Sequence, residues 1–176
     1  MSTTRRKPVP PVPDSLDRLD AVRAAVPLTP EPETACCARL MERADVPVRD
    51  DARTWLTFLR GLGLVEETDR GYVRTRDDLD RAALSERFLE GVYGARELRE
   101  TVECTGPLGV DEAFEQFREH VPQYERHRTD DWETVWRGRV TRLLGWGTLF
   151  GVFERTDAGY AASQGGAVRS DSESSM

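Results

Sequence analysis

The 176-residue sequence predicts a mainly helical fold with two small β-hairpins, an α+β class arranged as two domains in tandem. Apolar residues recur at three- and four-residue spacing in several segments, as expected of amphipathic helices. Two pairs of short β-prone runs each enclose a turn of the form Thr-Asp-x-Gly. The second turn and the residues before it repeat the first at a fixed distance, which indicates an internal duplication.

Two helices are predicted before residue 48. The Asp14-Ser15 pair suits the start of the first, and Pro27 brings it to an end. The second is predicted from Thr34 to about Ala44, and residues 45–48 form the turn that follows. These short connections place three helices next to one another along the chain.

The third helix and the first hairpin occupy residues 49–75. The apolar face of this helix consists of Ala52, Trp55, Leu56, Leu59 and Leu62. Gly61 and Gly63 end it, because glycine accepts a left-handed cap. Residues 64–67 and 72–75 are then predicted as two short strands around a tight turn.

The second half of the chain ends in the same way. Thr68–Tyr72 recurs as Thr156–Tyr160, so the two tyrosines are 160 − 72 = 88 residues apart. The same offset aligns Gly63 with Gly151 and Phe58 with Trp146. Before this repeat, helices are predicted at 95–104, at 110–120 and from Asp130 or Asp131 onward, whereas 123–129 is expected to be irregular.

The order helix, helix, turn, helix, hairpin, with Gly-Leu-Val-Glu and a Gly-Tyr hairpin after the third helix, resembles the winged helix-turn-helix superfamily in tandem copies. The predicted organisation is a first winged helix at 14–76, a connector helix at 77–92 and a second winged helix at 93–163. Residues 1–13, basic and proline-rich, and residues 164–176, acidic and serine-rich, are expected to be disordered tails.

The charge composition resembles that of proteins from extreme halophiles, haloarchaea among them. The net charge is −7, yet Lys7 is the single lysine among 25 basic residues. Dense carboxylates hold water at low water activity, although a GC-rich genome also favours arginine over lysine. An acidic balance ordinarily opposes nucleic-acid binding, but molar salt screens charges within about 3 Å.

Other function classes find little support. The sequence contains no apolar run long enough to cross a membrane and no signal peptide, so we expect a cytoplasmic protein without a membrane partner. Cys36, Cys37 and Cys104 lack metal-site spacing, and no catalytic motif is present. We therefore predict no enzyme activity, no catalytic residue, no metal site and no cofactor.

The resemblance implies which side chains meet DNA: the exposed face of the third helix enters the major groove and the wing lies against phosphates. In the first unit these are Arg49, Arg53, Thr57, Arg60, Arg70 and Arg74. In the second unit the basic candidates are Arg128, Arg137, Arg139 and Arg142. Asp50 and Asp51 at the helix start, and the Glu66-Glu67 pair beside the wing, oppose binding to phosphate.

Two functions follow as hypotheses. The first is a DNA-binding transcriptional regulator that binds double-stranded DNA through tandem winged helices without a cofactor. The alternative is a winged-helix adaptor that binds a protein partner within a larger complex and does not contact DNA. The arginine placement favours the first, and the overall acidity favours the second.

Overall fold

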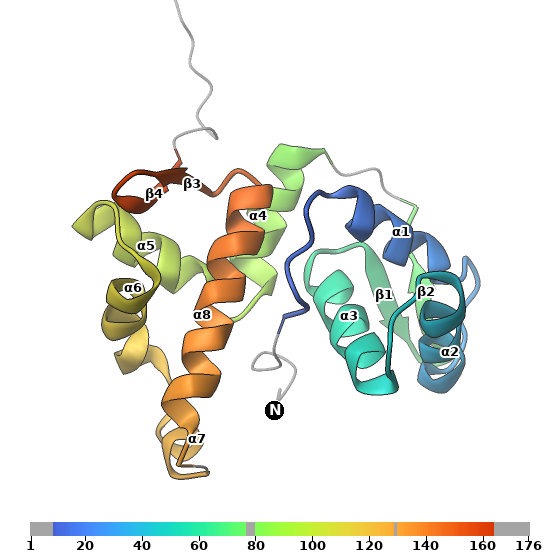
Figure 1. Cartoon of the computed structure of the whole chain (residues 1–176). Helices are drawn as coiled ribbons and strands as arrows, with labels where there is room; N and C mark the ends of the chain where they lie inside the picture. Colours follow the sequence, from blue (N-terminus) through green and yellow to red (C-terminus); the bar gives the residue numbers. More distant parts are fainter. Residues whose placement is uncertain (1–8, 77–79, 129, 164–176) are drawn as a thin grey trace, which may run out of the picture.

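The computed structural model describes residues 9–76, 80–128 and 130–163 (Figure 1). The first unit contains α1 (Asp17–Ala25), α2 (Glu33–Arg43), α3 (Arg49–Gly61), β1 (Val65–Thr68) and β2 (Gly71–Arg74). The connector is α4 (Arg81–Gly91). The second unit contains α5 (Ala95–Thr105), α6 (Val110–Phe117), η2 (Arg118–His120), α7 (Gln123–Arg128), α8 (Trp132–Leu149), β3 (Phe153–Thr156) and β4 (Gly159–Ala162). The predicted fold class is confirmed.

The two units share equivalent β-bridges and equivalent hydrogen bonds at the end of the third helix. Each antiparallel hairpin pairs with a residue before the second helix of its unit, Tyr72 with Glu31 and Tyr160 with Leu108. At the end of the third helix, the Leu64 N–H donates to the Leu59 carbonyl at 2.9 Å. The Val152 N–H donates to the Gly147 carbonyl at 2.7 Å in the same position. The duplication inferred from the turns therefore extends through the helix ends.

The second unit carries an insertion between its second and third helices. The tyrosines are 88 residues apart, but their bridge partners are only 108 − 31 = 77 residues apart. The extra residues include α7, which corrects the expectation that 123–129 is irregular; residue 129 lies outside the described residues. Pro122 supplies the first turn of α7, since its carbonyl accepts from the Glu125 N–H at 3.0 Å.

Aromatic side chains join the two units through their third helices. Phe58 of α3 and Trp146 of α8, which are equivalent positions in the repeat, contact each other with ring centroids 4.6 Å apart. Phe150 stacks on Trp146 at 5.6 Å and meets Phe88 of the connector at 5.3 Å. All four rings are buried. One continuous hydrophobic core therefore runs through both winged helices and α4.

The chain before α1 packs between the two units. In Figure 1 its blue trace passes between α8 and α3. Val9 is 5% exposed and Pro10 is buried. The Trp146 Nε1–H donates to the Pro10 carbonyl at 2.8 Å, which satisfies a buried polar group. This packing corrects the expectation of a disordered tail through residue 13; residues 1–8 and the predicted tail at 164–176 lie outside the described residues.

Within the described residues, no helix is both long and apolar enough to cross a membrane.

Candidate nucleic-acid interface

The third helix of the first unit buries one face and leaves the other open. Ala52, Trp55, Leu56, Phe58 and Leu59 are buried, as their helical spacing predicts. The predicted DNA-contacting residues lie on the opposite side: Arg49, Arg53 and Arg60 are exposed and Thr57 is half-buried. Their spacing of four, four and three residues makes one row along α3.

Carboxylates of the same unit neutralise part of this row. Arg53 lies 3.6 Å from Glu33 of α2 and 3.7 Å from Asp50. Arg60 lies 2.8 Å from Glu67 of the wing. All of these side chains are at least 41% exposed. Exposed pairs of this kind contribute at most about 1 kcal/mol, so a phosphate group can compete for the arginines.

The two predicted wing arginines lie in different settings. Arg70 is exposed at the turn between β1 and β2, where its N–H donates to the Thr68 hydroxyl at 3.1 Å. Arg74 is at the other end of β2 and half-buried, and its backbone N–H donates to the Pro27 carbonyl at 2.8 Å. The structure therefore places Arg70, and not Arg74, at the wing tip.

The predicted arginines of the second unit lie mostly against their own protein. Arg128 is exposed and lies 3.7 Å from Glu125. Arg137 contacts Asp111 at 3.1 Å. Arg139 is half-buried over the Trp136 ring, and burial lowers its pKa from the usual value. Arg142 donates from Nη1 to the Val9 carbonyl at 2.9 Å.

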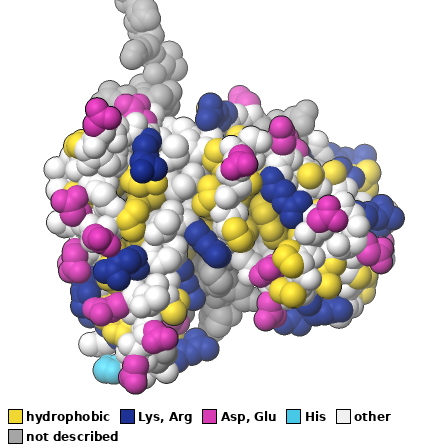
Figure 2. Space-filling model, in the orientation of Figure 1, with side chains coloured by type: hydrophobic (Ala, Val, Ile, Leu, Met, Phe, Trp, Pro, Cys, Tyr) yellow, Lys and Arg dark blue, Asp and Glu magenta, His cyan; other side chains and the backbone are white. Residues whose placement is uncertain are grey.

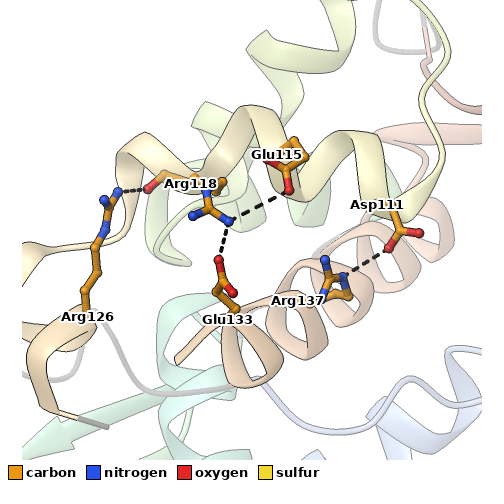
Figure 3. A network of polar contacts seen from close by, with 6 residues as sticks. All are labelled: Asp111, Glu115, Arg118, Arg126, Glu133 and Arg137. Atoms are coloured by element: carbon orange, nitrogen blue, oxygen red, sulfur yellow. Dashed lines mark hydrogen bonds and ion pairs between the residues drawn. The ribbon is translucent and has the colours of Figure 1, made fainter. Parts of the chain in front are cut away.

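Two further arginines, Arg118 and Arg126, belong to a polar network at the start of α8 (Figure 3). Arg118 lies 2.5 Å from Glu133 and 3.8 Å from Glu115, and its guanidinium lies over the Trp132 ring. Arg126 of α7 donates to the Arg118 carbonyl. Together these contacts fasten η2 and α7 to α8. No sequence pattern indicates the part played by Arg118, because its partners come from three different elements.

The surface has mixed charge. On the face drawn in Figure 2, basic and acidic side chains alternate over both units. Beside the wing, a groove of about 580 Å³ is lined by Arg60, Glu66, Glu67 and Asp69 among others. Within the part of the chain that the structure describes, no three His, Cys, Asp or Glu side chains are grouped to hold a metal ion. The first recognition helix therefore carries a row of arginines within a surface of both signs.

Comparison with known proteins identifies the family of this chain. A model of the halobacterial double winged helix domain matches residues 4–167, nearly the whole chain, and so confirms both the tandem winged helices and the halophilic character. Neither the curated proteins nor the solved structures contain a match.

Proposed function

Because the chain belongs to the halobacterial double winged helix family, we propose that it binds double-stranded DNA in the cytoplasm and acts as a transcriptional regulator without a cofactor. The observation that carries the proposal is the open row of Arg49, Arg53, Thr57 and Arg60 on α3. The aromatic contact between the units uses the opposite side of this helix, so docking of the two winged helices leaves the row accessible.

In this arrangement α3 enters the major groove and the wing lies along the phosphate backbone. Arginine suits both contacts, since its planar fork grips a phosphate or the guanine edge through two hydrogen bonds. Arg53 and Arg60 exchange their carboxylate partners for DNA on binding. Arg70 at the wing tip supplies a phosphate contact.

The test is duplex binding by the full-length protein across a salt series, with circular dichroism at each salt to show that the protein stays folded. Several phosphate contacts predict that log affinity falls with log salt by about 0.9 for each phosphate neutralised. Arg53→Ala and Arg60→Ala should each weaken binding by about five-fold or more, corresponding to about 1 kcal/mol. Arg96→Ala, at an exposed position of α5, is the matched control and should change nothing. Folded protein that binds no duplex at low salt would refute the proposal.

The second candidate is a protein-interaction adaptor. The observation that favours it is the acidic surroundings of the row, where Glu33, Asp50 and Glu67 each pair with an arginine that DNA would need. Glu67→Gln separates the two candidates, because it frees Arg60 and removes a negative charge from the wing. A DNA-binding α3 predicts tighter duplex binding by this variant. An adaptor predicts that neither the variant nor the parent binds duplex.

A further inference from the structure

The C-terminal half of α8 is covered by the chain segment before α1, whereas the corresponding face of α3 is open. The offset of 88 residues makes Gly145 the equivalent of Thr57, which belongs to the open row of α3. A Cβ atom at position 145 would lie 2.7 Å from Cγ2 of Val12 and 3.1 Å from its Cγ1. Glycine is unfavourable within a helix, and here its absent side chain makes room for the N-terminal segment.

The same stretch of α8 provides hydrogen-bond donors for this segment. Arg142 donates from Nη1 to the Val9 carbonyl at 2.9 Å, and Trp146 donates from Nε1 to the Pro10 carbonyl at 2.8 Å. These two residues are one helical turn apart. A proline-rich strand has few N–H groups and keeps its carbonyls free, so a receptor must supply donors and an apolar surface.

The other wall of the site comes from the first unit. Pro11, Val12 and Pro13 line a groove of about 550 Å³ together with Trp55 of α3 and Pro47 of the preceding turn. Trp55 in turn contacts Trp146 edge to face, with centroids 5.8 Å apart. Trp146 on the α8 side, and Trp55 with Pro47 on the side of the first unit, give the strand surroundings like the aromatic grooves that recognise polyproline segments.

We propose that α8, with Trp55 opposite it, forms a receptor for a proline-rich strand, and that residues 9–13 of this chain are its occupant. Arg142, Gly145 and Trp146 make up the receptor face: a cationic donor, a flat contact and an indole donor. While the strand is bound, the part of α8 that corresponds to the open row of α3 is closed to DNA or to a protein partner. The tandem winged helices therefore present one open recognition helix and one that holds the chain's own N-terminal segment.

The test uses the full-length protein and the exchange rate of the Trp146 indole proton, with its NMR signal assigned through Trp146→Phe. Gly145→Ala should displace Val12 and accelerate this exchange at least ten-fold. Gly138→Ala is the matched control, because a Cβ atom at that position on the same helix meets nothing within 4 Å. The control should leave the exchange rate unchanged and raise Tm by about 2–4 °C through better helix propensity.

A size exchange completes the test. Removing both Cγ atoms in the double variant Gly145→Ala/Val12→Ala leaves Cβ of residue 12 about 3.3 Å from the new methyl group. A shift of the strand by a few tenths of an ångström relieves this contact, so the strand should bind again and slow exchange should return. If Gly145→Ala instead keeps slow exchange and gains stability as Gly138→Ala does, the receptor does not exist. Fast exchange in the double variant would equally overturn the proposed fit between positions 12 and 145. The readout involves no DNA, so its outcome is independent of the duplex assay.

Discussion

At the residue scale, the three cysteines lie in different surroundings. Cys36 is buried on α2, and its Sγ donates to the Glu31 carbonyl at 3.5 Å. Burial first, and the Glu31 carboxylate second, raise the pKa of the Cys36 thiol from 9.0 to about 11. Burial also raises the pKa of Cys37, whereas Cys104 is exposed at the end of α5. The buried thiols are packing groups that the fold keeps protonated.

The raised pKa of Cys36 in the folded state predicts how the stability of the protein depends on pH. The folded state holds the Cys36 proton more tightly than the unfolded state, so its contribution is complete below about pH 9 and is lost as the pH rises through about 11. Urea unfolding at pH 8, 9, 10 and 11 should show a fall in unfolding free energy over this window. Cys36→Ala should show a smaller fall, and an identical pH profile for the two proteins would contradict the assignment.

At the element scale, α4 crosses the end of α3 through a contact between two glycines. A Cβ atom on Gly91 would collide with the Gly61 carbonyl oxygen and lie 2.7 Å from its carbon. Both partners are backbone, so no side chain can move aside to relieve the overlap. Phe88 lies one turn before Gly91 and packs on Phe150 of the second unit. The glycine contact therefore fixes how the connector reaches both units.

Gly91→Ala should accordingly destabilise the protein even though alanine is the better helix former. We expect a loss of about 2–3 kcal/mol, the cost of forcing backbone apart in a packed crossing, measured by urea unfolding. Gly138→Ala, which adds the same methyl group in open space, should be stabilising. A neutral or stabilising Gly91→Ala would show that α4 does not approach α3 this closely.

At the scale of the whole molecule, the aromatic contact between the third helices joins the two units into one cooperative folding unit. Phe58 is 3% exposed and Trp146 is fully buried, and each ring covers part of the other across the boundary between the units. Through these two rings the hydrophobic cores of the two units form one continuous core. We expect them to unfold together.

Phe58→Ala tests this cooperativity. The substitution should lower the unfolding free energy by about 3–5 kcal/mol, because it leaves a cavity between the units. Wild type and variant should each show a single urea transition that coincides in tryptophan fluorescence and far-ultraviolet circular dichroism. Two separate transitions in the wild type would mean that the winged helices fold independently.

The hairpins could be predicted from the sequence because their determinants are local. In the first wing the Thr68 hydroxyl accepts from the Arg70 N–H at 3.1 Å and donates to the Gly71 carbonyl at 3.0 Å. In the second, Thr156 makes the same two bonds to Ala158 and Gly159. A threonine and a glycine three residues apart are visible in the sequence without any knowledge of the fold.

The candidate site was only partly predictable, because whether an arginine is exposed or held by its own protein depends on residues far away in the sequence. The row on α3 follows from helical spacing alone. That Arg142 turns to Val9 depends on a contact across 133 residues, and no local pattern distinguishes it from the exposed arginines of α3. The proline-rich composition of residues 9–13 predicted a disordered tail. Their packing could not be predicted, because the side chains that donate to their carbonyls are on α8, far along the chain.

The meeting of Phe58 with Trp146 has a consequence for how this protein assembles. Equivalent residues touch at the two-fold axis of an isologous homodimer, and Phe58 with Trp146 is a contact of that kind between two repeats of one polypeptide. The linkage replaces a bimolecular step by an intramolecular one, so the pairing does not weaken when the protein is dilute. The two halves of one polypeptide also need not have the same sequence, as the two subunits of a homodimer must. Thr57 in one half and Gly145 in the other are such a difference: Thr57 belongs to the open row of α3, whereas the position of Gly145 is covered by Val12.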